Sequence, residues 1–125
     1  MSEYRRINID GTIYYGKHML LTARQCSESI LDKQAIGDFC RTLVDRIDMV
    51  AFGDCIVERF GGGIETGISA AQLIETSLIS MHTNDQARDM YLDVFSCKWF
   101  SEEDVEQFVR EVFNPKSVTY QIILR

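Results

Sequence analysis

The region between residues 68 and 97 constrains the fold most strongly, because it holds three short apolar runs separated only by brief polar turns. Runs of this length, rich in β-branched residues and bounded by turn residues, are typical of β-strands. Similar runs occur earlier in the chain, where Gly61-Gly62-Gly63 ends one of them, and again at its end. The sequence therefore predicts strands over residues 11–22, 50–60, 68–75, 78–82, 90–97 and 117–124, with residues 1–10 as a polar lead-in and 83–88 as a polar turn.

Two further stretches have helical periodicity instead. In the first, Ser27 and Ser29 are candidate N-caps, and apolar residues fall on one face as far as about Ile47. That face comprises Ile36, Phe39, Cys40, Leu43, Val44 and Ile47. The second begins at Ser101, with Asp104 three residues later as in a short capping box, and Pro115 stops it. Its buried stripe is Val105, Phe108, Val109 and Val112.

This order of strands and helices implies an α+β fold, a two-layer sandwich in which two helices pack on one face of a mostly antiparallel sheet. A length of 125 residues is enough for one hydrophobic core. There is no short-period repeat and no linker, so we expect a single domain over residues 1–125.

Composition excludes several classes of function. A net charge of −6 argues against nucleic acid as a partner, because phosphate binding needs a basic face. No apolar stretch approaches a membrane span, and residues 1–10 are polar and lack the apolar run expected of a secretory leader. The four cysteines form no C-x-x-C pair, which favours reduced thiols in a cytoplasmic protein. With only two histidines and no cluster of ligands, we expect no metal site.

Four residues in the central region form a candidate catalytic set: Ser69, Ser77, His82 and Cys97. A serine hydroxyl beside an internal peptide bond, with a titratable base and a thiol nearby, is what a self-cleaving pyruvoyl enzyme requires. Each residue alone also has an ordinary explanation, since serine is common at strand ends and a buried cysteine usually acts as a small apolar residue. The combination of all four residues is what indicates a catalytic site.

The same spacing resembles the small prokaryotic S-adenosylmethionine decarboxylases. In that family a motif ESHxSxHT carries the serine that becomes a pyruvoyl group, and a downstream DxFxC carries a catalytic cysteine. Here the matching residues are 76–83 (TSLISMHT) and 93–97 (DVFSC), with weaker likeness at 67–69 and at 16–18. The resemblance implies cleavage between Thr76 and Ser77 into chains 1–76 and 77–125, and a role in spermidine synthesis.

The resemblance also assigns roles within the site. Ser69 and His82 would serve the cleavage reaction, and Cys97 would reprotonate the substrate carbon after CO2 leaves. The pyruvoyl carbonyl, derived from Ser77, would form a Schiff base with the substrate amine and act as an electron sink, so that no other cofactor is needed. Phe60 lies where the family keeps an aromatic that stacks on adenine, although a core position is equally compatible with the sequence. Cys26, Cys40 and Cys55 are interpreted as packing residues.

Three departures from the family pattern concern the substrate pocket. The glutamate before the serine is Thr76, with Glu75 one place earlier; the following histidine is Leu78; and the acidic residue four beyond His82 is Gln86. Asp85 could replace that carboxylate, which the family uses for the ribose hydroxyls, only through a rearranged turn. Glu75, Asp85 and Phe60 are therefore the candidate substrate-binding residues.

These departures leave three hypotheses open. The chain is a decarboxylase of S-adenosylmethionine, the same chemistry acts on another amino acid such as arginine or ornithine, or the protein is an uncleaved relative that binds a ligand or partner. A homodimer is expected in each case, because a small two-layer domain leaves a sheet face or edge that a second copy can cover.

Overall fold

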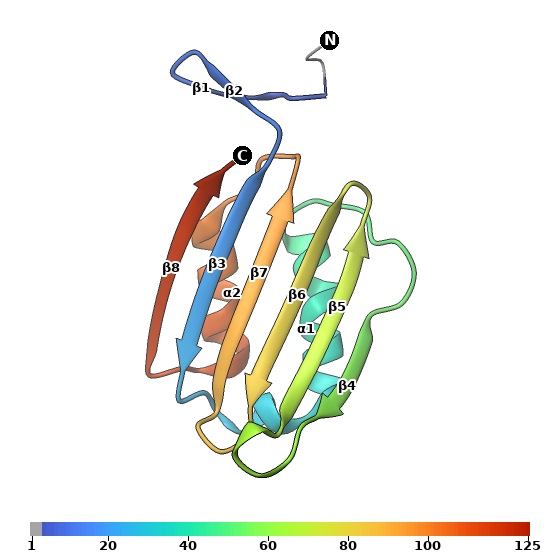
Figure 1. The fold of residues 1–125 in the computed structure, drawn as a ribbon, viewed down its shortest axis with the longest axis vertical. Coiled ribbons are helices and arrows are strands. Elements are labelled where there is room, and N and C mark those ends of the chain that lie inside the picture. The colour runs from blue at the N-terminus through green and yellow to red at the C-terminus, as the bar shows by residue number, and fades with distance from the viewer. Residues whose placement is uncertain (1–3) are drawn as a thin grey trace.

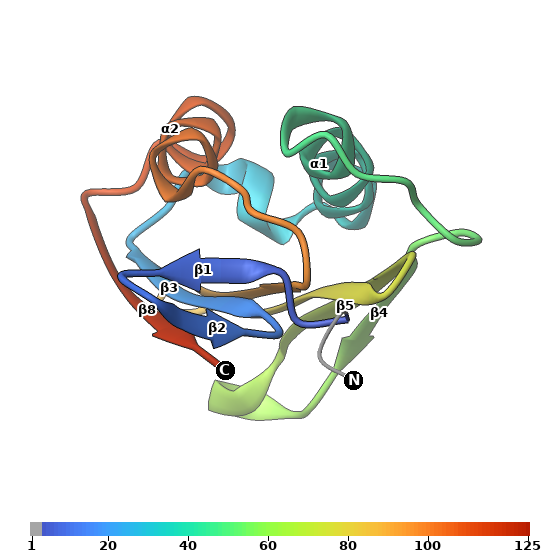
Figure 2. The same cartoon turned by 90° about the horizontal axis from the view of Figure 1, so that it is seen from above.

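The computed structural model describes residues 4–125 and contains a six-stranded antiparallel sheet covered on one face by two helices (Figures 1 and 2). The strand order across the sheet is β4-β5-β6-β7-β3-β8. The strands are β3 (Lys17–Arg24), β4 (Ile56–Phe60), β5 (Gly67–Ile74), β6 (Ser77–Asn84), β7 (Asp89–Ser96) and β8 (Ser117–Leu124). The predicted α+β two-layer architecture is confirmed.

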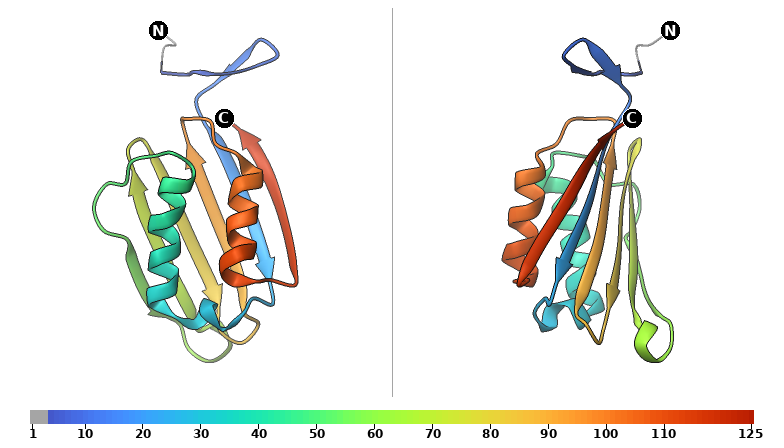
Figure 3. Two further views of the ribbon diagram at one scale, coloured as in Figure 1. Left: turned by 180° about the vertical axis from the view of Figure 1, so that it is seen from behind. Right: turned by 60° about the vertical axis from the view of Figure 1, so that its left-hand side comes forward.

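The helices α1 (Lys33–Arg46) and α2 (Glu102–Phe113) lie side by side on the same face, as the view from behind shows (Figure 3). The Ser101 side chain caps α2 by accepting a hydrogen bond from the backbone N–H of Asp104, as predicted. Every residue of the stripe predicted for the first helix is buried in the core. In α2 the core residues are Val105, Phe108, Val109 and Phe113, while Val112 is only partly buried.

Several predicted boundaries were wrong. The first helix starts later than expected: residues Glu28–Leu31 form a 3-10 helix, and Asp32 caps α1 through the backbone N–H of Gln34. The predicted strand over 50–60 is reduced to β4 and an isolated bridge between Ala51 and Ile74. Residues 51–54 are exposed and contribute little to the core, so their apolar side chains do not hold them in the sheet.

The N-terminal prediction was wrong in the same way. The region predicted as one strand over 11–22 divides at Gly16, and the lead-in is partly a strand. A separate hairpin, β1 (Ile7–Ile9) and β2 (Thr12–Tyr14), stands beyond one end of the main sheet (Figure 1). A short 3-10 turn, η2 (Gly63–Glu65), follows the glycine run, and the turn predicted over 83–88 is confined to 85–88 because β6 extends to Asn84.

Within residues 4–125 no helix covers the second face of the sheet, and the view along the strands shows this face open (Figure 2). Alternation along each strand places one set of residues toward the helices and the next toward this open face. Large exposed apolar side chains on the open face are Ile56, Phe60, Leu73, Leu78, Tyr91 and Ile123. Among the described residues, no helix is both long and apolar enough to cross a membrane.

Candidate active site

The peptide bond predicted to break lies in the tight turn between β5 and β6. Ile74 pairs with Ser77, so only Glu75 and Thr76 connect the two strands. Thr76 has a φ of 61°, in the left-handed region. A β-branched residue is unusual there, because its side chain crowds the backbone, and such a conformation costs about 1–3 kcal/mol. The backbone strain therefore lies in the residue whose carbonyl Ser77 would attack.

Cys97 lies beside this turn. Its Sγ is 2.9 Å from Thr76 Oγ1, and that hydroxyl is also 2.5 Å from the carbonyl oxygen of Glu75. A hydroxyl has one proton to donate. If the Thr76 hydroxyl donates to the Glu75 carbonyl, the Cys97 thiol is the donor to Thr76 Oγ1. The thiol proton then points at the Thr76 side chain, in the residue that precedes Ser77.

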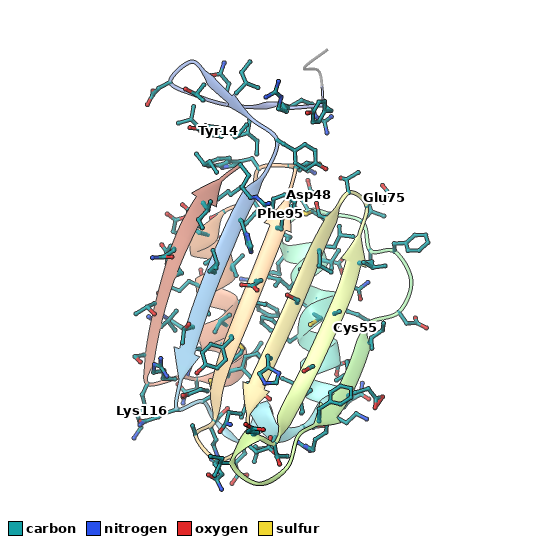
Figure 4. All side chains as sticks on the ribbon, viewed as in Figure 1. Tyr14, Asp48, Cys55, Glu75, Phe95 and Lys116 are labelled. Atoms are coloured by element: carbon teal, nitrogen blue, oxygen red, sulfur yellow. The ribbon has the colours of Figure 1, made fainter. Side chains whose placement is uncertain are left out.

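A cavity of about 440 Å³ surrounds the turn, and its wall includes residues that the sequence did not single out. Arg6, Met49 and Lys98 line it together with Ser77 and Cys97. Arg6 reaches it from the N-terminal segment, with Nη2 3.9 Å from the Cys97 sulfur. Figure 4 shows that Asp48, Glu75 and Phe95 gather at this end of the sheet. Nothing in the spacing of Arg6 indicated this, because its position depends on the path of the hairpin.

A buried lysine holds the segment that carries Cys97. Lys17 is fully buried and donates to the carbonyl of Phe100 at 2.6 Å and to the carboxylate of Glu102. Its ammonium also lies 3.8 Å from the centre of the Trp99 ring. Burial tends to raise the pKa of Glu102, but hydrogen bonding to Lys17 and the charge of that lysine outweigh burial, and the net shift is downward. The segment from Cys97 to Phe100 is thereby fixed between β7 and α2.

Ser69 and His82 form the second part of the predicted set. They face each other across β5 and β6, and Ser69 Oγ lies 2.8 Å from His82 Nδ1. Gly67 permits the close approach of the two strands here, since a Cβ at that position would lie 1.7 Å from the carbonyl oxygen of Thr83. This hydrogen bond leaves Nε2 of the imidazole free to serve a reacting group.

The structure does not bring the two parts together within one chain. His82 is five residues along β6 from Ser77, a separation of about 17 Å in an extended strand. The odd number of residues also puts the two side chains on opposite faces of the sheet. Ser77 and Cys97 therefore form one group at the end of the sheet, while Ser69 and His82 form another on its open face.

His82 borders a second cavity, of about 610 Å³, on the open face. Phe60 and Tyr91 supply aromatic walls, and Glu65 and Asp89 supply carboxylates. Phe60 is 59% exposed, so the interpretation of Phe60 as a core residue was wrong, while its ring is available for stacking.

The two predicted acidic residues differ in their surroundings. Glu75 is exposed and lines the cavity at Ser77. Asp85 instead pairs with Arg59, with 3.4 Å between Nε and Oδ2, and its Oδ1 is buried without a hydrogen-bond partner among the described residues. The turn thus holds Asp85 against β4. Residues 4–125 contain no group of three or more potential metal ligands.

Fold and site together define a two-layer α+β domain with a serine after a strained turn and a thiol beside it. Over residues 17–125 the chain matches the profile of the S-adenosylmethionine decarboxylase family, and it belongs to that family. Membership in this family implies a pyruvoyl cofactor.

Two individual proteins extend the comparison. The arginine decarboxylase proenzyme of Caldivirga maquilingensis is 34% identical over 73 residues, which are 58% of this chain; the match spans only 54% of that relative's length. The crystal structure of the adenosylmethionine decarboxylase from Aquifex aeolicus VF5 superposes with a TM-score of 0.73 over 90% of this chain and 91% of that one, at 18% identity. This likeness confirms the fold.

Proposed function

We propose that the protein is a proenzyme that cleaves itself between Thr76 and Ser77 and then decarboxylates S-adenosylmethionine, in the manner of spermidine biosynthesis. The observation that carries the proposal is the left-handed backbone of Thr76, a β-branched residue, immediately before Ser77 and beside Cys97. Such strain persists only where the surrounding structure imposes it, and it concentrates at functional sites. Positive φ is common in two-residue hairpin turns, where glycine or asparagine usually supplies it; at this turn a β-branched residue does so.

In the cleavage step, the Ser77 hydroxyl attacks the carbonyl carbon of Thr76, and the amide C–N bond breaks to leave an ester. Removal of the Ser77 α-proton by a base expels the Thr76 carboxylate by β-elimination. The dehydroalanine that remains is hydrolysed with loss of ammonia, leaving chains 1–76 and 77–125. Relief of the strain at Thr76 favours the first step, and the Cys97 thiol, which contacts Thr76 Oγ1, is the candidate donor to the carbonyl oxygen that becomes negative.

The surroundings of Ser77 fit a pyruvoyl group at that position. Ser77 borders a cavity open enough for a small substrate, and Cys97 on the same wall can protonate a carbon held there. When formed, the pyruvoyl group supplies an electron sink for the loss of CO2. The residues of the cavity bind the substrate, and the side formed by Met49 and Arg6 excludes water. Cys97 returns a proton to the substrate carbon.

A second substrate is favoured by the pocket on the open face. The family's ribose carboxylate is Gln86 here, and Asp85 is engaged by Arg59, which removes the expected contact to a nucleoside. The cavity instead combines two aromatic rings with the carboxylate of Glu65, a setting that suits a guanidinium or ammonium group. The arginine decarboxylase relative points the same way. Arginine, or the related cation ornithine, is therefore the second candidate.

We propose further that a homodimer completes the site. The open face carries exposed apolar side chains that a second copy would bury, and each chain holds the Ser69–His82 pair far from its own Ser77. If the two sheets pack with their strands running in opposite directions, the Ser69–His82 pair of one copy comes to the end of the other copy's sheet, where the Thr76–Ser77 turn lies. This arrangement supplies the base that a single chain does not place near the turn.

The test uses freshly synthesised protein followed by intact mass spectrometry, with Ser77→Ala as the control. Two fragments, the second carrying an N-terminal pyruvoyl, support the proposal; a single unchanged mass refutes it and leaves an uncleaved binding protein. Release of labelled CO2 from carboxyl-labelled S-adenosylmethionine, arginine and ornithine then assigns the substrate. Fully cleaved protein that releases none from any of the three would refute the decarboxylase assignment for these substrates.

A further inference from the structure

The N-terminal hairpin of β1 and β2 adds to the candidate active site, although it lies outside the residues 17–125 that match the family profile. Figure 1 shows the hairpin beyond the end of the sheet at which the β5–β6 turn also lies. The side chain of Ile7 is buried. Gly16, which follows the hairpin, exchanges two backbone hydrogen bonds of 3.0 and 2.9 Å with Arg125. These contacts hold the hairpin against the domain.

Two cavities meet at the base of this hairpin. One is the cavity at Ser77, and the other, of about 460 Å³, is lined by hairpin residues 7–9 and by the segment that follows β7. Arg6, Cys97 and Lys98 line both cavities. The side chains of these three residues therefore form a shared wall, which contains two cations and the thiol.

The two cations of the shared wall differ in their partners. Lys98 Nζ donates to the carbonyl of Asp48 at 2.7 Å and lies 3.2 Å from the carboxylate of the same residue. Arg6 Nη2 lies 3.9 Å from the Cys97 sulfur, and within residues 4–125 its guanidinium makes no ion pair. A guanidinium has five N–H donors in a planar fork that fits a carboxylate. Arg6 thus keeps donors for an anion in the cavity at Ser77.

We propose that Arg6 binds the α-carboxylate of the amino acid substrate and positions it beside Cys97, an inference that rests on the proposed function. In an amino acid held by its amine at Ser77, only the α-carbon separates that nitrogen from the carboxylate. The Thr76 hydroxyl is 2.9 Å from the Cys97 sulfur, and Arg6 contacts the same sulfur, so an unbroken series of contacts leads from the cleavage point to the guanidinium. S-adenosylmethionine, arginine and ornithine all carry this carboxylate, so the contact selects an α-amino acid whatever its side chain.

The same contact distinguishes the substrate from the product. Loss of CO2 removes the carboxylate, so the amine that remains cannot bind Arg6 in this way, although it shares the other groups of the substrate. An interaction made in the ground state and not strengthened in the transition state lowers KM without raising kcat. Arg6 is therefore a positioning residue that favours the binding of the amino acid over that of its amine.

The first experiment compares two alkylating reagents of nearly equal size, neutral iodoacetamide and anionic iodoacetate, on the reduced, folded, full-length protein. Peptide mass spectrometry follows the rate at Cys97 and, as a reference, at Cys55 on the β4 edge (Figure 4). Arg6→Met should lower the ratio of the iodoacetate rate to the iodoacetamide rate at Cys97 about fivefold, because the carboxylate loses its ionic partner. The ratio at Cys55 should not change. Arg6→Lys should retain part of the ratio, because it keeps the charge without the planar fork.

Arg5→Met is the matched control, because it removes the same charge one residue earlier. Arg5 is exposed, lines neither cavity and lies 5.6 Å from the centre of the Tyr4 ring, so its replacement should leave the ratio at Cys97 unchanged. An equal loss of the ratio in Arg5→Met and Arg6→Met would mean that net charge is responsible, and the proposal would be overturned. Failure of both reagents to modify Cys97 would also overturn it, since a small carboxylate could not then reach the thiol.

The second experiment uses cleaved protein and the substrate that it decarboxylates. Arg6→Met should raise KM about 5- to 30-fold without lowering kcat, and should leave the inhibition constant of the product amine unchanged. An equal rise in both constants would refute a contact with the carboxylate. If the protein does not cleave, the decarboxylase proposal fails, while the alkylation ratio still decides whether Arg6 binds a carboxylate. If it cleaves and Arg6→Met leaves the ratio at Cys97 unchanged, only the role of Arg6 is refuted.

Discussion

Replacing Thr76 by glycine should slow self-cleavage, because glycine adopts the left-handed conformation without crowding. If the strain of about 1–2 kcal/mol is released on reaching the transition state, its removal slows cleavage roughly 5- to 30-fold. In a Ser77→Ala background, where cleavage cannot occur, the same change should stabilise the fold. The flexibility of glycine offsets part of the gain and leaves a net increase of about 1 kcal/mol or less.

Thr76→Val is the matched control. Valine keeps the β-branch and therefore the strain, but it removes the hydroxyl that contacts Cys97 and the Glu75 carbonyl. Thr76→Asn relieves the strain while retaining a polar side chain, because asparagine tolerates the left-handed region. The fraction cleaved is followed by intact mass after cell-free synthesis, and stability by urea denaturation. If Thr76→Gly cleaves as fast as the unaltered protein while Thr76→Val is slow, the hydroxyl is responsible and the argument from strain is refuted.

Three further predictions test the rest of the site. Co-expressed with Ser77→Ala chains, His82→Ala chains should be cleaved, whereas alone they should not; absence of rescue in a confirmed mixed dimer would show that the base does not come from the second copy. Cys97→Ala should lower product formation per cleaved chain at least tenfold, measured against the pyruvoyl content; equal turnover would remove Cys97 from the protonation step. Lys17→Met should destabilise the fold by about 2–4 kcal/mol in thermal unfolding, because it leaves the Glu102 carboxylate without its partner. The folded-state pKa of Glu102 is lowered, so the contribution of this carboxylate to stability is present at neutral pH and is lost as the pH falls through that pKa. If Lys17→Met loses as much stability between neutral and acid pH as the unaltered protein does, this role of Glu102 is refuted.

The layered fold could be predicted because its signals are local and repeated. The last strand was predicted at its observed bounds, and the α2 N-cap and the stripe of α1 were also found, since each depends on residues a few positions apart. The N-terminal hairpin was missed because its residues Ile9 and Ile13 are exposed and carry no alternation toward the core. The start of α1 was missed because Ser27 and Ser29 hydrogen-bond to each other rather than to helix N–H groups, leaving Asp32 as the cap.

The candidate site was only partly predictable for a related reason. The family resemblance grouped Ser69 with His82, and the structure shows that the pairing of β5 with β6 is what brings them together. The strands predicted over 68–75 and 78–82 left Ser77 in the connection between them, at the edge of the observed turn. Arg6 and Lys17 could not be recognised, because their contacts with the Cys97 segment span more than 80 positions along the chain. Spacing identifies neighbours within a hairpin, but not side chains that arrive from another part of the fold.

Because the two residue groups lie apart in one chain, the rate of self-cleavage depends on whether a second copy has to bring them together. Within one chain, the strained Thr76 and the Cys97 thiol are already in contact through the Thr76 hydroxyl, so their geometry depends only on folding. The Ser69–His82 pair is equally preformed, but it lies on the open face about 17 Å along β6. If cleavage needs both, its rate must depend on protein concentration below the dissociation constant of the dimer and become constant above it. A cleavage rate independent of concentration across the monomer–dimer transition would mean that one chain contains the whole reaction, and the role assigned to the second copy would be wrong.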